Sequence, residues 1–285
     1  MVVKEVVVKD YLSKSKLGEY TINPYVGCPH ACKYCYASFM KRFTNHSEPW
    51  GEFVDVKLCD KPIALDKIAG KTVFMSSVTD CYNPLEAKYK ITRKILEQLK
   101  NSTAFVQINT KNKLILRDLE LLKQIKHLTV GMSVNTLNEK FSRDMDRAST
   151  ISDRLETLKT LHENGIYTIL FMSPIFIGIT DWKAIIEKTK DFIDEYWFED
   201  LNLRGSYKFA IMNYIKGHYS ALYPIYDETY NKGNRAKLNE LNHAIKEFCE
   251  EQNIKFSDCF HHEEMMDRRA KGLKNDMFPE QLKFI

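Results

Sequence analysis

Apolar and polar positions follow two different periods along this chain. Short runs of β-branched and aromatic residues, which favour strands, alternate with longer stretches in which apolar residues recur every three or four positions. This alternation predicts successive βα units and therefore a parallel sheet. We predict six strands, at residues 20–26, 72–78, 103–109, 128–134, 167–173 and about 200–204.

The segments between these strands have the pattern of amphipathic helices. Each presents one apolar face, and such faces occur at residues 91–99, 119–125 and 155–161. The last of them follows Thr150 and Asp153, a pair that suits a helix N-terminus. Six βα units can form either an open doubly wound sheet or an incomplete barrel, and in both folds ligands gather at the carboxyl ends of the strands.

A change of pattern near residue 217 divides the chain. A polar, glycine-containing stretch around residues 231–234 precedes one more amphipathic helix near residues 238–248. We therefore predict that residues 1–217 hold the six units and that residues 218–285 form a mostly helical extension, which could recognise a substrate.

The composition excludes several classes of protein. With 285 residues, 44% of them apolar, the chain can bury a large core. Its 42 Lys and Arg against 38 Asp and Glu give a formal charge of only +4, so a nucleic-acid partner is possible but is not indicated by charge. The longest apolar stretch, residues 166–179, is too short to cross a bilayer, and the N-terminus lacks a secretory signal. We expect a cytoplasmic protein without a membrane partner.

Three of the seven cysteines form a motif. Cys28, Cys32 and Cys35 are spaced Cys-x3-Cys-x2-Cys directly after the first predicted strand. In a reducing compartment such spacing predicts a metal or redox site. Three thiolates can hold three irons of a four-iron cubane and leave the fourth iron open. A structural zinc site is the alternative, and His30 or Cys59 would have to complete it.

The motif, with Tyr34 as the aromatic residue before its last cysteine, resembles the radical S-adenosylmethionine (SAM) superfamily. The resemblance extends over residues 20–204 and implies a partial (β/α)6 barrel of the TIM type, a [4Fe-4S] cluster, and SAM bound at the open iron. It also implies an external reductant such as flavodoxin or ferredoxin. Residues 79–84 and 92–97, with Lys111 and Arg117, are similar to the branch that includes spore photoproduct lyase.

The resemblance also implies which side chains contact SAM. Ser133 and Arg147 are similar to residues that bind the ribose and the SAM carboxylate in relatives, and a guanidinium suits a carboxylate because its fork binds both oxygens. Arg154 competes for the same task, but its place at the start of a helix indicates a solvated residue. Lys111 resembles a lysine that contacts SAM in the lyase branch, although an ordinary loop lysine is equally consistent.

Four further residues complete the candidate site. Ser77 is expected to contact the SAM amino group, and Tyr34 and Tyr36 to border the adenine. Cys81 lies near the position from which spore photoproduct lyase returns a hydrogen atom to its product radical, so it is a candidate hydrogen donor. A buried structural thiol is the alternative for Cys81.

These features leave several functions open. The first is a radical SAM enzyme that abstracts hydrogen from an unidentified substrate. A DNA-repair lyase similar to spore photoproduct lyase is a narrower version, and modification of RNA or a peptide is another. The last alternative is a non-catalytic protein in which an iron–sulfur cluster or zinc only fixes the N-terminal loop.

Overall fold

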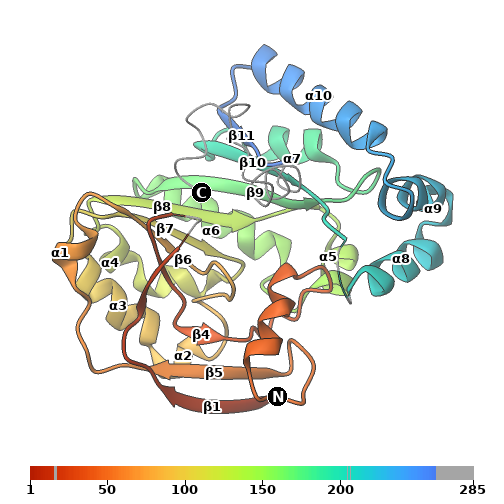
Figure 1. Ribbon diagram of the computed structural model, residues 1–285. Helices are drawn as coiled ribbons and strands as arrows, with labels where there is room; N and C mark the ends of the chain where they lie inside the picture. The colour runs from red at the N-terminus through yellow and green to blue at the C-terminus, as the bar shows by residue number, and fades with distance from the viewer. Residues whose placement is uncertain (16–17, 204, 206, 261–285) are drawn as a thin grey trace, which may run out of the picture.

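The structure is a computed structural model that describes residues 1–15, 18–203, 205 and 207–260. Its described strands form two sheets, a large one that carries most of the helices and a small one near the N-terminus (Figure 1). The remaining residues, including 261–285 of the predicted extension and Arg204 of the sixth predicted strand, lie outside the described part.

The large sheet has eight strands in the spatial order β11-β10-β9-β8-β7-β6-β3-β2. Their bounds are β2 Leu12–Lys14, β3 Tyr20–Ile22, β6 Thr72–Met75, β7 Phe105–Thr110, β8 His127–Ser133, β9 Tyr167–Ile175, β10 Glu195–Asp200 and β11 Phe256–Asp258. All neighbours are parallel except β2 and β3, which are antiparallel. The two strands at the ends of this order are β11 and β2. The predicted α/β class, with consecutive parallel units, is confirmed.

Helices fill the connections between the parallel strands. The α-helices are α1 Leu65–Ile68, α2 Glu86–Tyr89, α3 Ile91–Leu99, α4 Leu119–Leu122, α5 Glu139–Met145, α6 Ile151–Glu163, α7 Trp182–Thr189, α8 Tyr207–His218, α9 Tyr223–Tyr226 and α10 Ala236–Glu251. Three short 3-10 helices are η1 Tyr36–Phe43, η2 Lys113–Asp118 and η3 Ser220–Leu222, and η4 Asp227–Asn231 is a π-helical turn. Thr150 caps α6 as predicted, since its side chain accepts a hydrogen bond from the backbone of Asp153.

The small sheet was not predicted. It consists of β1 Val2–Val7, β5 Phe53–Leu58 and β4 Tyr25–Val26, in the order β1-β5-β4. The first predicted strand, residues 20–26, is in fact divided between the two sheets. Pro24 lies at the division, where its missing N–H prevents the ladder from continuing.

The two faces of the large sheet differ in character. Along β7, Val106 and Ile108 belong to the hydrophobic core, whereas Gln107 and Asn109 belong to the other face. Gly131 on β8 lets the Asn109 side chain lie against the sheet, since a Cβ there would be 2.3 Å from the Asn109 Oδ1 atom. The face away from the core therefore carries hydrogen-bonding groups.

The sixth predicted strand is wrong in position. The strand is β10, Glu195–Asp200, and residues 201–203 follow it without regular structure. Two acidic residues of this strand accept hydrogen bonds from neighbouring side chains. The indole of Trp197 and the hydroxyl of Ser257 each donate to Glu195 at 2.7 Å, and Ser173 donates to Glu199.

The described part of the predicted extension, residues 218–260, is mostly helical, and it also supplies β11 to the edge of β10. The division at residue 217 stays a prediction.

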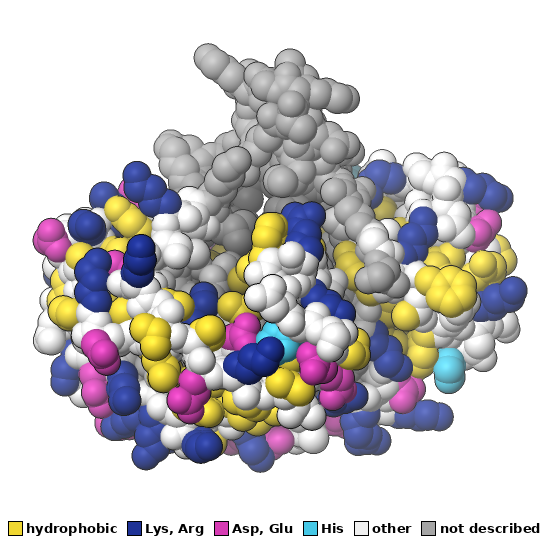
Figure 2. All heavy atoms as spheres, turned by 60° about the horizontal axis from the view of Figure 1, so that its bottom comes forward, with side chains coloured by type: hydrophobic (Ala, Val, Ile, Leu, Met, Phe, Trp, Pro, Cys, Tyr) yellow, Lys and Arg dark blue, Asp and Glu magenta, His cyan; other side chains and the backbone are white. Residues whose placement is uncertain are grey.

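On the face that carries β1 and β5, Lys and Arg side chains are interspersed with Asp and Glu (Figure 2), in keeping with the nearly balanced charge.

Candidate functional site

The three motif cysteines lie on one loop between β4 and η1. Cys28 is buried and Cys32 and Cys35 are half-buried, and all three are free thiols. Backbone hydrogen bonds shape the loop, because the amide of Cys35 donates to the carbonyl of Cys32 at 3.1 Å and that of Ala31 donates to the carbonyl of Cys28 at 3.2 Å. The sequence motif is therefore a compact structural unit.

A second segment holds this loop in place. The amide of Lys33 donates to the carbonyl of Met145 at 2.9 Å, and the amide of Arg147 donates to the carbonyl of His30 at 2.7 Å. The loop is thus joined to the chain that follows α5, more than a hundred residues later.

Burial favours the protonated form of these thiols. It raises the pKa of Cys32 to about 12, even though the nearby Lys111 lowers that pKa, and it raises the pKa of Cys28 well above its ordinary value. Metal ions displace such protons because only the thiolate is a ligand. Neutral thiols in this loop would become thiolates on metal binding.

A buried hydrogen bond between His30 and Asp80 joins the cysteine loop to the segment after β6. The His30 Nε2 atom lies 3.0 Å from a carboxylate oxygen of Asp80. That carboxylate also accepts from the Thr110 hydroxyl, the Lys111 amide and the Tyr82 amide, each at 2.8 Å. Burial alone would raise the pKa of Asp80, but His30 and these hydrogen bonds hold it below its ordinary value.

A second buried network lies beside Cys32. The Asp146 carboxylate, 3% exposed, lies 2.5 Å from the Arg154 guanidinium and 3.3 Å from the Lys111 ammonium. Lys111 also donates to the Tyr34 hydroxyl at 2.6 Å and lies 4.7 Å from the centre of that ring. Burial would raise the pKa of Asp146, but Lys111 and Arg154 lower it to about 2, so the carboxylate is ionised at neutral pH.

The two candidate arginines lie in different surroundings. The Arg147 side chain is 64% exposed and pairs with Glu52 at 2.7 Å. Arg154 is not the solvated residue that its helix position indicated, since it is only 1% exposed. Its guanidinium also donates to the carbonyl of Ser133 at 3.2 Å. Arg154, and not Arg147, therefore connects the end of β8 to the network around Asp146.

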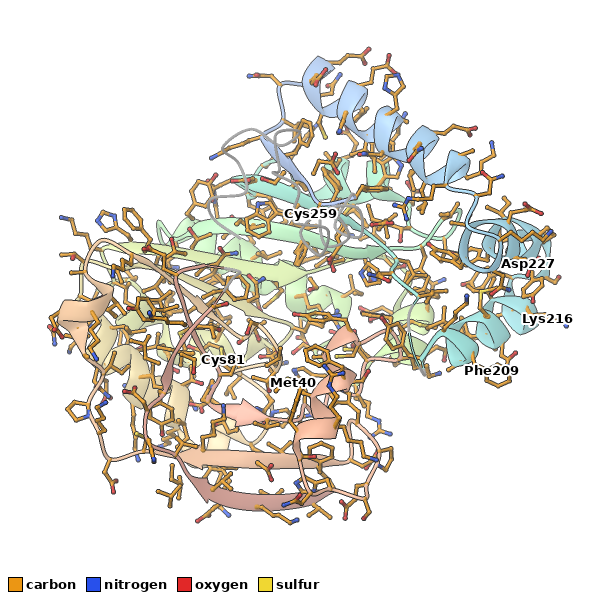
Figure 3. The ribbon with its side chains drawn as sticks, viewed as in Figure 1. Met40, Cys81, Phe209, Lys216, Asp227 and Cys259 are labelled. Atoms are coloured by element: carbon orange, nitrogen blue, oxygen red, sulfur yellow. The ribbon has the colours of Figure 1, made fainter. Side chains whose placement is uncertain are left out.

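The other predicted contacts lie around the same loop. Ser133 ends β8 and is half-buried. Ser77, at the end of β6, is buried, and its hydroxyl accepts from the Asn23 amide at 2.9 Å. Tyr36 is more than half exposed on η1, and its hydroxyl donates to the carbonyl of Ser77. Figure 3 labels Met40, also on η1, near the middle of the molecule.

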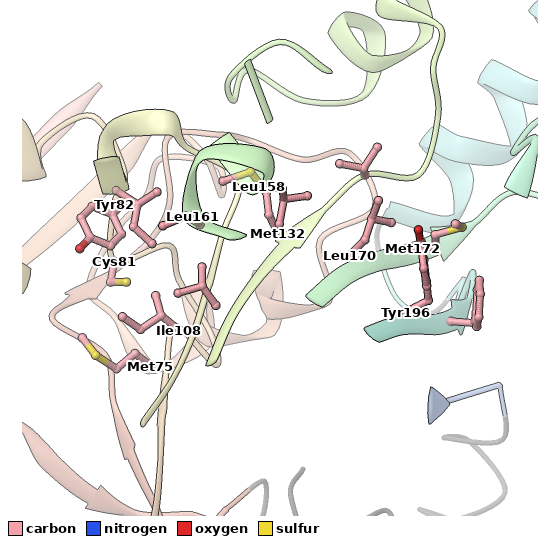
Figure 4. Close-up of a cluster of buried hydrophobic side chains, with 14 of the residues drawn as sticks. Met75, Cys81, Tyr82, Ile108, Met132, Leu158, Leu161, Leu170, Met172 and Tyr196 are labelled. Atoms are coloured by element: carbon pink, nitrogen blue, oxygen red, sulfur yellow. The ribbon is translucent and has the colours of Figure 1, made fainter. Parts of the chain in front are cut away.

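Cys81 lies apart from these groups. It is fully buried in the hydrophobic cluster of Figure 4, together with Met75, Tyr82 and Ile108. Burial raises the pKa of its thiol well above the ordinary value. This environment matches a structural thiol, the alternative interpretation of Cys81.

Sequence reasoning missed the anchoring role of Asp80 and overlooked Asp146. Each lies next to a residue that the sequence singled out: Asp80 directly precedes Cys81, and Asp146 directly precedes Arg147. No local pattern reveals that Asp80 meets His30 or that Asp146 meets Lys111, because these pairs are 50 and 35 residues apart.

The residues present fit a four-iron cluster better than a single metal ion. Among the described residues, no three His, Cys, Asp or Glu side chains converge on one ion. A four-iron cluster needs a different arrangement, because each thiolate binds its own iron. Two buried nitrogens near the loop, His30 Nδ1 and Trp50 Nε1, also have no hydrogen-bond partner, as expected where a group with acceptor atoms is to be bound.

Comparisons with known proteins concern the family and the fold. A family profile described as "Radical SAM superfamily" matches residues 22–189. An uncharacterised protein of Methanocaldococcus jannaschii is 39% identical over 208 residues, which cover 73% of this chain and 79% of that protein. An uncharacterised protein of Acidianus two-tailed virus is 33% identical over 207 residues, which cover 65% of this chain and 68% of that protein.

Solved structures share the fold. Spore photoproduct lyase complexed with dinucleoside spore photoproduct has a TM-score of 0.56 and 16% identity, over 74% of this chain and 65% of the lyase. Streptococcus suis SuiB bound to its precursor peptide SuiA has a TM-score of 0.54 and 17% identity, over 90% of this chain and 52% of SuiB. The chain thus spans just under two thirds of the lyase and about half of SuiB, and at these identities the likeness concerns the fold alone.

None of the helices in the described ranges has the length and apolar character that a bilayer crossing requires.

Proposed function

Because this chain belongs to the radical SAM superfamily, we propose that Cys28, Cys32 and Cys35 hold its [4Fe-4S] cluster and that SAM binds at the iron they leave open. One observation carries the proposal: three free thiols lie on one loop that is fixed by its own hydrogen bonds and by the segment after α5. When bound, the reduced cluster supplies the electron that cleaves SAM to methionine and a hydrogen-abstracting 5′-deoxyadenosyl radical.

The network around Asp146 supports a binding site for the SAM carboxylate. Lys111 and Arg154 bring two positive charges, and Asp146 neutralises one of them, so one net positive charge remains in a buried setting. An anion is attracted to such a site, and the planar guanidinium can bind both oxygens of a carboxylate. We therefore assign the carboxylate contact to Arg154 in place of Arg147.

Other residues have supporting parts in the same proposal. We assign the ribose contact to Ser133, whose carbonyl accepts a hydrogen bond from Arg154, and Ser77 and Tyr36 join the segment after β6 to the cysteine loop. Tyr34 orients Lys111 through its hydroxyl. Cys81 packs the core, in keeping with its complete burial, and we assign it no hydrogen transfer.

The enzyme needs an external reductant, as radical SAM enzymes do, and we propose a flavodoxin or a ferredoxin. The substrate is to be sought experimentally. The spore photoproduct lyase structure holds a dinucleoside spore photoproduct and the SuiB structure holds a precursor peptide, so dinucleoside photoproducts and peptides are the first compounds to test.

The decisive experiment is an anaerobic assay for 5′-deoxyadenosine. The protein is reconstituted with iron and sulfide, reduced with dithionite and given SAM. We expect 5′-deoxyadenosine from the parent chain and none from the triple variant Cys28→Ala, Cys32→Ala, Cys35→Ala.

Cys59→Ala is the matched control, since Cys59 is a half-buried cysteine outside the motif, and it should retain both iron and activity. A triple variant that still binds four irons per chain would contradict the ligand assignment. If a fully loaded, reducible cluster gave the same electron paramagnetic resonance spectrum with and without SAM, SAM binding would be contradicted.

A further inference from the structure

Two aromatic rings on η1 are exposed beside the cysteine loop. The exposed fraction is 43% for Phe39 and 66% for Phe43. The Arg42 guanidinium lies over both rings, 5.4 Å from the centre of Phe39 and 4.7 Å from that of Phe43. Aromatic and Arg side chains are the types that protein interfaces concentrate, and neighbouring exposed apolar groups with a polar rim mark interaction sites.

The charge that accompanies these rings is positive. The chain has no Asp or Glu between residues 20 and 47. The Lys41 ammonium donates to the carbonyl of Ser47 at 3.0 Å, and in the described part of the chain neither Lys41 nor Arg42 forms an ion pair. Both cations can therefore pair with carboxylates of another molecule. Phe39, Lys41, Arg42 and Phe43 are called the η1 patch below.

The η1 patch lies close to the proposed cluster. The helix η1 begins at Tyr36, directly after Cys35, and the amide of Ser38 donates to the Cys35 carbonyl at 3.3 Å. Electron transfer between proteins slows steeply as the distance between the redox groups grows. A reductant therefore has to dock on a surface near the cluster, and the η1 patch is such a surface.

We propose that the η1 patch is the docking site of a flavodoxin that reduces the cluster. The inference rests on the proposed function, because it requires Cys35 to be an iron ligand. The flavin of a flavodoxin exposes an apolar edge within an acidic surface. Phe39 and Phe43 match that edge, and Lys41 and Arg42 match the surrounding carboxylates. On docking, one electron leaves the reduced flavin and enters the oxidised cluster.

The size and charge of the η1 patch favour this partner over a nucleic acid. Electron-transfer complexes are weak and bury little surface, so a small patch is sufficient. A single-stranded nucleic acid also combines negative charge with flat apolar groups, but it needs a basic groove that follows several nucleotides. The η1 patch has two adjacent cations, and the chain as a whole has a formal charge of only +4.

The test compares two reductants of the same reconstituted protein, dithionite and a purified bacterial flavodoxin that has been reduced photochemically. Formation of 5′-deoxyadenosine at increasing flavodoxin concentration gives a KM for flavodoxin. Lys41→Glu with Arg42→Glu reverses both charges of the η1 patch, and Phe43→Ser removes its most exposed ring. Iron and sulfide content are measured for every protein.

The matched control reverses two charges far from the cysteine loop. Lys123→Glu with Lys126→Glu changes the segment between α4 and the amino end of β8. The cysteine loop instead contacts the segments that follow the carboxyl ends of β6 and β7. The control should therefore keep the parent KM for flavodoxin.

We expect the charge-reversed variant to raise the KM for flavodoxin at least about tenfold, because two attractions become repulsions. Phe43→Ser should raise it at least about threefold, since exposed aromatic rings are frequent binding hot spots. The rate with dithionite should stay within about twofold of the parent in every variant, because dithionite needs no docking site. Added salt should raise the KM of the parent more than that of the charge-reversed variant.

Several results would overturn this inference alone. They are an unchanged KM in the charge-reversed variant, a parent that works with dithionite but not with flavodoxin, and a variant with a full cluster that loses its rate with dithionite. A ferredoxin that depends on the same residues and has a lower KM than flavodoxin would also overturn it. So would a single-stranded oligonucleotide that binds the parent but not the charge-reversed variant, if the KM for flavodoxin were unchanged. Failure of the parent chain to form 5′-deoxyadenosine with dithionite would overturn the proposed function itself.

Discussion

A single carboxylate, Asp146, pairs with two cations, the buried Arg154 and the half-buried Lys111. Arg154 could not be 1% exposed without such a partner, since buried guanidinium groups are almost always paired. In the sequence, Arg154 lies in the first turn of a helix, where an exposed charged residue is common, and nothing nearby indicates a partner. The choice between Arg147 and Arg154 therefore depends on tertiary contacts that no local pattern encodes.

The first prediction at this scale concerns SAM affinity. Arg154→Gln should weaken SAM binding at least about tenfold, because a charged hydrogen bond to a carboxylate contributes about 1.5–3 kcal/mol. Arg147→Gln, on the exposed residue, should change the affinity by less than about twofold. Equilibrium dialysis with reconstituted protein of equal iron content measures both, and the opposite order would contradict the assignment.

The second prediction concerns acid stability. The folded pKa of Asp146, about 2, is below its unfolded value of 3.8, so its contribution to stability is full above pH 4 and is lost as the pH falls toward 2. A shift of this size corresponds to about 2 kcal/mol. In Asp146→Asn the free energy of unfolding should therefore fall less steeply between pH 4 and pH 2 than in the parent. Urea denaturation at several pH values measures the free energy of unfolding of both proteins. An equal dependence on pH in Asp146→Asn and the parent would refute the prediction.

At the scale of the element, the turn from β4 into the cysteine loop depends on a glycine. Gly27 has a φ of +86°, and a Cβ there would lie 2.3 Å from the backbone oxygen of Phe53 on β5. The close approach of two backbones leaves no space for a side chain. The glycine before Cys28 thus belongs to the structure of the motif as much as the cysteines do.

Gly27→Ala should lower the free energy of unfolding by more than about 2 kcal/mol, since it adds a clash to an unfavourable backbone conformation. Gly70→Ala is the matched control: Gly70 has a φ of +68° but nothing within 4 Å of its added Cβ, so it should cost only about 1 kcal/mol. Urea denaturation of both variants without iron tests the difference. Equal losses of unfolding free energy in the two variants would contradict the prediction, because they would show that neighbouring residues shift to relieve the clash at residue 27.

A strand or helix can be predicted from sequence when its own residues carry the pattern that specifies it. The strands β7, β8 and β9 appear within about two residues of their predicted positions, because each is a short run rich in apolar residues. The alternating pattern of β5, Phe53–Leu58, is a signal that sequence analysis overlooked. The exposed strand β1 carries no such alternation, and only its pairing with β5 makes it a strand.

The candidate site likewise combines residues that a local motif reveals with contacts that only the fold creates. The three cysteines were recognisable because the motif spans eight residues. The contacts of Asp146 with Tyr34, and of Gly51 with Ala31, join segments that are distant in sequence or lack any motif. Such contacts are consequences of the fold and could not be predicted before it.

At the scale of the molecule, the large sheet joins both predicted parts of the chain. The strand β11 pairs with β10 in parallel, and Asp258 at its end forms an ion pair with Lys246 of α10. Elements that share a sheet and a core usually unfold together. The predicted extension is therefore structurally continuous with the βα units in the described residues.

We accordingly expect one cooperative thermal transition for the whole chain without iron, with equal calorimetric and van't Hoff enthalpies. Differential scanning calorimetry measures both quantities. Two separate transitions would instead support independent folding of the part after residue 217.

The position of β11 has a further consequence for synthesis of the chain. The edge of β10 that β11 covers is complete at residue 200, but its partner begins only at residue 256. At about 5–20 residues per second, the ribosome adds the intervening segment in roughly 3–11 seconds. During that interval the nascent protein exposes an unpaired strand edge, which is a template for aggregation. Chaperone demand should therefore be greatest late in translation, and slower elongation after residue 200 should lower the yield of folded protein.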